Sequence, residues 1–183
     1  MIFGKRIRLT APEREDIPLF VAWLNDPEVR QGLAAYLPMS NAKEEQWFED
    51  MLKRPPETHP LTIEIREGDQ WIKIGNMGLF DINQRARSAE VGIMIGNKNY
   101  WNKGYGTEAM KLILLHGFET LNLHRIMLHV YDFNPRAIRS YQKAGFVEEG
   151  RLRQSIYKDG KYHDTILMSV LRDEWDGRKE HEE

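Results

Sequence analysis

The stretch from residue 88 to residue 121 constrains the fold more than any other part of the chain. Residues 88–95 alternate as a half-buried β-strand does, and two sets of side chains result. One face carries Ala89, Val91, Ile93 and Ile95, and the other carries Glu90, Gly92 and Met94. A loop over 96–103 follows, and 103–121 then places apolar residues at helical spacing. The pattern predicts a strand, a glycine-containing loop and a helix with one buried face.

The remaining periodicity predicts a mixed α/β fold. Further strands are expected at 6–9, 61–66, 71–80 and 124–131 and around a turn at 158–161, and further helices at 13–24, from 41 onward and at 135–144. This order has neither the strict strand–helix alternation of a doubly wound sheet nor the strand-only pattern of a sandwich. We expect a single domain over 1–173 and a charged C-terminal tail over 174–183.

Two helices carry terminal signals. For the helix at 135–144, Asn134 suits the N-cap, Pro135 the first position and Gly145 the position just past the end. For the other helix, Asn41 with Glu44 three residues later predicts a capping box. Its buried face is expected to carry Trp47, Phe48, Met51 and Leu52.

Composition excludes several classes of protein. The net charge of −2 gives no support for a nucleic-acid partner, which requires a concentrated basic surface. No segment approaches the roughly 20 apolar residues of a membrane span, and the N-terminus has no signal-peptide pattern. The chain has no cysteine, so disulfides, thiolate metal sites and cysteine nucleophiles are excluded. No histidine or carboxylate cluster has metal-ligand spacing. We expect a cytoplasmic protein without a metal.

The loop before the helix at 103–121 has the residues of an anion site. Gly104 and Gly106 allow close backbone approach, and the free amides of a helix N-terminus attract phosphate. The same spacing also fits a dinucleotide fingerprint, but that motif needs an acidic residue about 20 positions later, and position 129 is histidine. In a third interpretation, the two glycines only allow the backbone to turn and bind no ligand.

A second segment narrows the choice. Residues 134–146 read Asn-Pro-Arg-Ala-Ile-Arg-Ser-Tyr-Gln-Lys-Ala-Gly-Phe. Together the two segments resemble the GNAT acetyltransferase superfamily, whose glycine-rich pyrophosphate loop is followed by an Asn…Ala…Tyr…Gly-Phe segment. The matching positions are Gly104, Gly106, Asn134, Ala137, Tyr141, Gly145 and Phe146. Trp101 stands where the family usually has arginine or glutamine, and the surrounding residues resemble the branch of ribosomal-protein N-terminal and spermidine acetyltransferases.

The resemblance implies a fold and a cosubstrate. The fold is a mostly antiparallel central sheet flanked by helices, splayed between the family's fourth and fifth strands, here 88–95 and 124–131. The cosubstrate is acetyl-coenzyme A. The implied cofactor contacts are the backbone of Ile93, Met94 and Ile95 for the pantetheine, the amides of Lys103, Gly104, Tyr105, Gly106 and Thr107 for the pyrophosphate, and Asn134 and Arg136 beside them.

The resemblance also indicates catalytic candidates. Tyr141 would protonate the leaving thiolate, because a tyrosine near pKa 10 can pass a proton to a thiol near 8.5; its alternative role is packing in the helix face. Glu90 would take the proton of the amine through water, and its alternative is a solvated strand residue. His124, His129 and His163 lie near strands and compete as bases.

The sequence says less about the acceptor amine than about the fold or the cosubstrate. At pH 7 an α-amine is about 15% neutral, whereas a lysine-like amine is neutral about once in 2,500 molecules. Acidic residues at Asp26, Glu28, Glu44 and Glu45 could select a cation. Tyr36, Trp47 and Phe80 could line the acceptor pocket or pack in the core.

Three functions remain. The leading one is direct acetyl transfer to an amine at a protein N-terminus, with no covalent acetyl-enzyme. The second is acetylation of a small molecule such as a polyamine, amino sugar or antibiotic. The third is a non-catalytic acyl-coenzyme A sensor. A homodimer stays open, because no surface stripe in the sequence indicates one.

Overall fold

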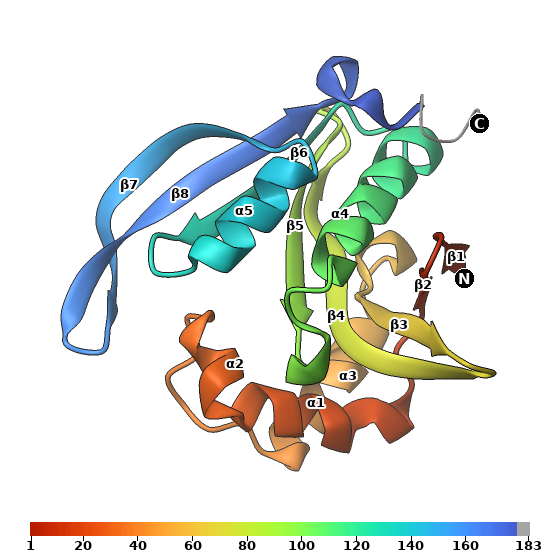
Figure 1. The fold of residues 1–183 in the computed structure, drawn as a ribbon, viewed down its shortest axis with the longest axis vertical. Coiled ribbons are helices and arrows are strands. Elements are labelled where there is room, and N and C mark those ends of the chain that lie inside the picture. The colour runs from red at the N-terminus through yellow and green to blue at the C-terminus, as the bar shows by residue number, and fades with distance from the viewer. Residues whose placement is uncertain (179–183) are drawn as a thin grey trace.

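The eight strands within residues 1–178 join one sheet, in the order β1-β2-β3-β4-β5-β6-β8-β7 (Figure 1). The computed structural model describes residues 1–178. The strands are β1 (Ile2–Phe3), β2 (Ile7–Thr10), β3 (Leu61–Glu67), β4 (Gln70–Asn83), β5 (Ser88–Ile95), β6 (Arg125–Tyr131), β7 (Val147–Lys158) and β8 (Lys161–Leu171). Within the described residues β5 and β6 form the sole parallel pair, so the mostly antiparallel mixed fold is confirmed.

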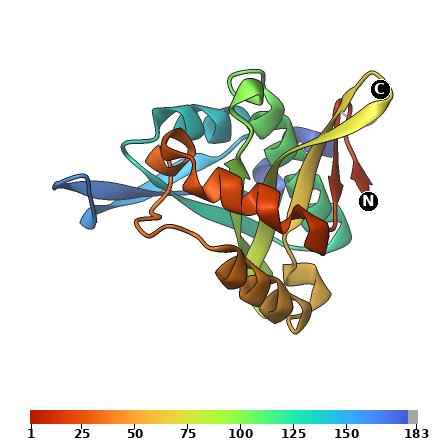
Figure 2. The same cartoon turned by 90° about the horizontal axis from the view of Figure 1, so that it is seen from below.

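Five α-helices flank this sheet. They are α1 (Ile17–Asn25), α2 (Pro27–Gln31), α3 (Asn41–Leu52), α4 (Tyr105–Leu115), which a π-helical turn at His116–Thr120 extends, and α5 (Pro135–Lys143). Figure 2 shows α4 and α5 on one side of the sheet, α3 on the other, and α1 across one end. None of the helices in residues 1–178 combines the length and apolar character that a membrane span requires.

The core lies between α4 and the sheet. Met110, Ile113 and Phe118 are almost fully buried against strand residues such as Ile63 and Leu128. Burial of side chains of this size stabilises the fold by about 1.5–3 kcal/mol each. A smaller cluster of Ile17, Phe48 and Met51 joins α1 to α3. The core therefore fixes α4 against the central strands, and with it the helix N-terminus.

The sheet opens in its middle. β5 and β6 pair only from Ser88 to Glu90 against Arg125 to Met127, and no residue of 91–95 has a partner on β6. β6 continues along β8 instead, from Arg125 to Tyr131. The expected splay between these two strands is therefore present, and backbone groups of β5 face a gap rather than a neighbouring strand.

The predicted N-cap of α5 is present in the structure, whereas the predicted N-cap of α3 is not. Asn134 caps α5 by accepting a hydrogen bond from the Ala137 amide at 3.2 Å, and Gly145 follows with φ of 101°. At α3 the capping-box prediction was wrong. Ser40 is the N-cap, and its Oγ accepts from the Lys43 amide at 3.2 Å. Sequence spacing places a cap only to within a residue or two, since several small polar residues compete there.

Other differences arise from tertiary packing. Leu52, expected on the buried face of α3, is 53% exposed, because the helix buries a narrower stripe. The short helix α2 was not predicted. Beyond residue 173 the chain does not leave the fold at once, since Trp175 packs on Phe118 with ring centroids 5.3 Å apart. The last part of the expected tail, residues 179–183, lies outside the described residues.

Candidate functional site

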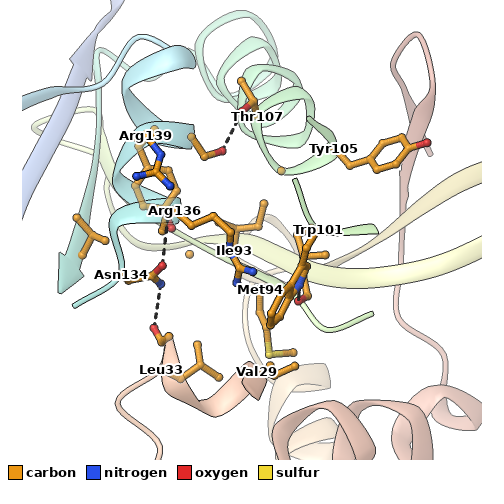
Figure 3. Close-up of a pocket in the computed structure, with 18 of the residues that line it drawn as sticks. Val29, Leu33, Ile93, Met94, Trp101, Tyr105, Thr107, Asn134, Arg136 and Arg139 are labelled. Atoms are coloured by element: carbon orange, nitrogen blue, oxygen red, sulfur yellow. Dashed lines mark hydrogen bonds between the residues drawn. The ribbon is translucent and has the colours of Figure 1, made fainter. Parts of the chain in front are cut away.

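A cavity of about 530 Å³ occupies the gap between β5 and β6 (Figure 3). Its wall is contributed by α2, β5, β6, α5 and the N-terminus of α4. Most of the predicted site residues lie along it: Ile93, Met94, Ile95, Gly104, Tyr105, Gly106, Thr107, Asn134, Arg136 and Tyr141. Lys103 and Glu90 are not among the lining residues. The fold thus brings together two sequence segments about thirty residues apart.

The N-terminus of α4 is built to present backbone amides. Gly104 is the N-cap with φ of 84°, a left-handed conformation that glycine adopts without steric cost. The first bond across this end runs from the Glu108 amide to the Gly104 carbonyl at 3.0 Å, so the amides before Glu108 precede the helical ladder. Arg6 fixes the turn from outside, because its amide and Nε both donate to Glu108, at 2.8 and 2.7 Å. A rigid, partly positive helix end results.

The walls on either side of this helix end are tied together. Thr107 Oγ1 lies 2.9 Å from Ser140 Oγ and so joins α4 to α5 (Figure 3). Asn134 joins α5 to α2, since its Nδ2 donates to the Gly32 carbonyl at 3.2 Å while its Oδ1 caps the helix. The side chain of Asn134 therefore holds two walls of the cavity in register.

Trp101 and Arg136 form a pair that sequence reasoning missed. The indole Nε1 donates to the Ile95 carbonyl at 2.7 Å, at the end of β5. The guanidinium of Arg136 lies 3.5 Å from the centroid of the Trp101 ring, and burial lowers its pKa. A stacked cation of this kind is favoured by the ring quadrupole. The tryptophan that departs from the family pattern thus has a defined structural role.

One side of α5 makes the cavity basic. Arg136, Arg139 and Lys143 stand at i, i+3 and i+7, so they share a helix face, and all three line the cavity. Their spacing was visible in the sequence, but the direction of that face was not. Together with the amides of α4, this face favours an anionic ligand.

Tyr141 contributes a buried phenol. Only 9% of the residue is exposed, and its ring packs against Phe146 with centroids 6.0 Å apart. Burial raises the pKa of Tyr141 to about 12. Among residues 1–178 the hydroxyl has no hydrogen-bond partner, and the residue lines the cavity. The phenol therefore holds its proton at neutral pH and can donate to a ligand.

Glu90 meets His129 where the two strands begin to part. His129 Nδ1 lies 2.7 Å from Glu90 Oε1. His129 lines the cavity, and Glu90 stands behind it. Tyr131, two residues further along β6, has its pKa raised by burial and, to a smaller extent, by the negative charge of Glu90. The other two candidate histidines lie elsewhere: His163 bonds Asp132 at 2.9 Å, and neither it nor His124 lines the cavity.

Three of the four acidic residues near the first helices are engaged in ion pairs, and the fourth, Glu44, is buried, which raises its pKa. Lys98 Nζ lies 2.9 Å from Asp26 and 2.6 Å from Glu28, and Asp26 also accepts a bond from the Glu28 amide at the start of α2. Hydrogen bonding to Lys98 is the main reason that the pKa of Asp26 is lowered. Glu45 pairs with Arg14 at 2.5 Å. Within residues 1–178 no carboxylate lines the cavity.

A second hollow of about 660 Å³ adjoins the first. Ala34 lines both, and the second lies between α2 with the following loop and the tip of the β7–β8 hairpin. Tyr36, 84% exposed, lines this hollow, as does Tyr157. The other aromatic residues proposed for an acceptor pocket lie elsewhere, since Trp47 packs on the α1–α3 cluster and Phe80 does not line either hollow.

The sequence of this chain is similar to a known protein family and to several known proteins. A family model described as acetyltransferase (GNAT) domain matches residues 6–147. The chain is 29% identical over 178 residues to the uncharacterized N-acetyltransferase p20 of Bacillus licheniformis, which covers 96% of this chain and 98% of that protein. It is 33% identical over 105 residues to the putative ribosomal N-acetyltransferase YdaF of Bacillus subtilis, or 57% of each chain.

A solved structure is also similar. It is the spermidine N-acetyltransferase from Vibrio cholerae in complex with CoA and spermine, with a TM-score of 0.84 and 29% identity over 93% of this chain and 98% of that one. Over its best-matching 107 residues, the Vibrio cholerae spermidine N(1)-acetyltransferase is 38% identical, covering 58% of this chain and 61% of that protein.

Proposed function

The chain belongs to the GNAT acetyltransferase family and uses acetyl-coenzyme A, and on that premise we propose that its acceptor is the α-amine of a protein N-terminus. Transfer occurs by direct attack of the amine on the thioester while both substrates are bound. The observation that carries this proposal is one continuous cavity that is lined by the N-terminus of α4, by Tyr141 and by α2.

The residues present fit the cosubstrate. The amides of Tyr105, Gly106 and Thr107 suit the pyrophosphate, since they precede the helical ladder at a partly positive helix end. Arg136 and the other basic residues of α5 add charge on the same side. The exposed edge of β5 suits the amide groups of the pantetheine, where Ile93 and Met94 offer backbone groups. The Ile95 carbonyl already accepts the Trp101 indole N–H, so its share in cofactor binding is the smaller.

Tyr141 serves the leaving group. As the amine nitrogen bonds to the thioester carbonyl carbon, the carbon–sulfur bond breaks, and the phenol donates its hydrogen bond and then its proton to the sulfur. The pKa of about 12 makes complete transfer to a thiolate near 8.5 uphill by about 3.5 units, or about 5 kcal/mol. The hydrogen bond from the phenol therefore strengthens first, as charge develops on sulfur, and the proton follows when the carbon–sulfur bond has broken. Glu90 belongs to the proton path of the amine.

Charge in the cavity supports an α-amine acceptor. A polyamine carries several positive charges and needs several carboxylates. Within residues 1–178 no carboxylate lines the cavity, whereas Arg136, Arg139 and Lys143 do, and Asp159 is the one carboxylate of the second hollow. An α-amine has one charge to lose and is about 15% neutral at pH 7. The second hollow, which begins at Ala34, offers room for the residues that follow such an amine.

A small-molecule acceptor is the second candidate. Its support is the similarity to the Vibrio cholerae spermidine N-acetyltransferase, whose structure contains spermine. For that candidate the engaged state of Asp26 and Glu28 is the difficulty, because a polyamine would have to displace Lys98 from both.

The test is release of coenzyme A from acetyl-coenzyme A in the presence of a panel of peptides, polyamines and aminoglycosides. Peptide-dependent release, with spermidine a poor competitor, supports the first candidate. Release that only spermidine or another small amine stimulates supports the second. Tight cofactor binding without release for any amine would instead match a non-catalytic acyl-coenzyme A sensor. A cytoplasmic location and a homodimer stay predictions.

A further inference from the structure

The contact between Glu90 and His129 bridges the two strands at the point where they separate. Glu90 pairs with Met127 in the last rung between β5 and β6, and His129 is two residues beyond that rung. The carboxylate and the imidazole meet at 2.7 Å, and both side chains are mostly covered, with 21% and 33% exposed. An imidazole held at one nitrogen by a carboxylate has a fixed orientation.

The two side chains stand in a definite order relative to the cavity. His129 lines it, whereas Glu90 does not. When the imidazole is neutral, a carboxylate at Nδ1 selects the tautomer with the proton on that nitrogen, so Nε2 keeps its lone pair. We propose that His129 is the general base that accepts the proton of the acceptor amine at Nε2, and that Glu90 is its positioning residue. This inference rests on the proposed acetyl transfer.

The protons of the step balance within the site. The ammonium form of the acceptor gives one proton to Nε2 of His129 before attack, and the imidazolium that forms faces the Glu90 carboxylate. After attack the carbon–sulfur bond breaks, the sulfur takes a proton from Tyr141, and the second proton that the nitrogen loses as the amide forms restores the phenol. His129 then releases its proton to water before the next turnover.

The charged side chain in direct contact with His129 is Glu90, and the cations Arg136, Arg139 and Lys143 line the same cavity. Glu90 faces His129 from β5. On β8 its register partner is Leu167, and β7 places Gly150 opposite Leu167, so neither neighbouring strand contributes a titratable group at that level. On its own strand the nearest titratable side chain of the same face is Tyr131, whose pKa is raised above its ordinary value.

The chain offers a matched control. His163 and Asp132 form a second imidazole–carboxylate pair, at 2.9 Å, that does not line the cavity. The experiment compares wild type, His129→Gln, Glu90→Gln and His163→Gln. It measures kcat and kcat/KM from pH 6.5 to 9.5 with the best amine of the panel, and coenzyme A affinity by calorimetry.

The expected result is a pH-dependent defect. His129→Gln should lower kcat at least about 30-fold at pH 7, and by less than about threefold at pH 9.5, where more of the amine is already neutral. Glu90→Gln should give a smaller loss of about three- to tenfold and move the acidic limb of kcat/KM to lower pH, because a charge that favours the imidazolium is gone. His163→Gln should stay within twofold of wild type, and all variants should bind coenzyme A within about twofold.

Each other outcome is decisive. If His129→Gln keeps more than a third of wild-type kcat at pH 7, or loses the same factor at every pH, His129 is not the base. Loss of activity in Glu90→Gln with an active His129→Gln makes Glu90 the base through water and overturns the assignment. If wild-type protein releases no coenzyme A with any amine, the proposed function itself is wrong. Failure of the His129 assignment is distinguishable from this result, because it is seen in the variants while the wild type stays active.

Discussion

Replacing Tyr141 by phenylalanine separates the chemistry of the phenol from its packing. The hydroxyl makes no hydrogen bond with any of residues 1–178, so its removal leaves no partner unsatisfied. The ring contact with Phe146 is kept. We expect the free energy of unfolding at pH 7 to change by less than about 1 kcal/mol, since a net hydrogen bond is worth about that much and none is lost.

The effect on catalysis should be much larger. A positioned acid contributes about 10²–10⁴-fold, and the raised pKa of about 12 weakens proton transfer, which favours the lower end of that range. Tyr141→Phe should therefore lower kcat about 100-fold, or about 2.7 kcal/mol in the activation free energy. The assay is coenzyme A release at saturating acetyl-coenzyme A with the best amine of the panel, and calorimetry checks that coenzyme A binding is unchanged within about threefold.

The raised pKa adds an independent check in alkaline solution. With a folded-state pKa of about 12, only about 1% of Tyr141 is ionised at pH 10, so kcat of the wild type should stay level between pH 8 and 10. The unfolded chain ionises near pKa 10, so the stability associated with the neutral phenol is complete below pH 10 and is lost as pH rises toward 12. Wild type should lose about 1.4 kcal/mol by pH 11 that Tyr141→Phe does not lose.

Two results would refute this reasoning. A fall in kcat of less than threefold, in a variant that still binds coenzyme A, removes Tyr141 from the acid role. A loss of more than about 2 kcal/mol in stability at pH 7 means that the hydroxyl has a structural partner, and the activity loss then says nothing about catalysis.

Two further predictions concern the walls of the cavity, and a third concerns the second hollow. Asn134→Ala should cost about 2 kcal/mol in urea unfolding, half from the cap and half from the bond to Gly32, whereas Asn134→Ser keeps the cap and should cost about half as much; equal losses would contradict the two-part role. Gly104→Ala should destabilise the protein by about 1–2 kcal/mol and weaken acetyl-coenzyme A binding, because its φ is 84°, while Gly106→Ala, with its nearest new contact at 3.6 Å, should stabilise it by up to about 1 kcal/mol; the reverse order would refute the assignment. Tyr36→Ala should raise KM three- to tenfold for a peptide acceptor and leave KM for a small amine unchanged, and an equal rise for both would remove the second hollow from acceptor binding.

Local signals predicted much of the fold because local physics decides them. The strand at 88–95 was expected with the bounds that it has, since its alternation leaves one face for the core. The helix after Asn134 was expected from cap to terminus, since a side-chain acceptor, a proline and a glycine meet the needs of consecutive backbone positions there. The candidate site residues that these elements carry, Tyr141 among them, were expected from the family pattern, and their roles stay predictions.

Contacts between distant segments could not be predicted in this way. Nothing in the spacing placed Arg136 on the ring of Trp101, or tied Asn134 to Gly32, which is 102 residues away. The acidic residues at 26 and 28 could select a cationic substrate as judged from the sequence, but in the structure both pair with Lys98. In each case a side chain could be assigned a chemistry from its type, but its partner depended on which elements pack together.

The sequence by itself indicated a mixed α/β fold, and its resemblance to the GNAT family predicted an anion-binding helix end at Gly104 and a catalytic role for Tyr141. Only the tertiary structure decided the register at which β6 pairs with β5. That register brings His129 to Glu90, 39 residues away, beside a cavity whose walls come from five separate elements. The physical reason is that hydrogen bonding and periodicity act over a few neighbouring residues, whereas the geometry of a site is fixed by burial of the whole core.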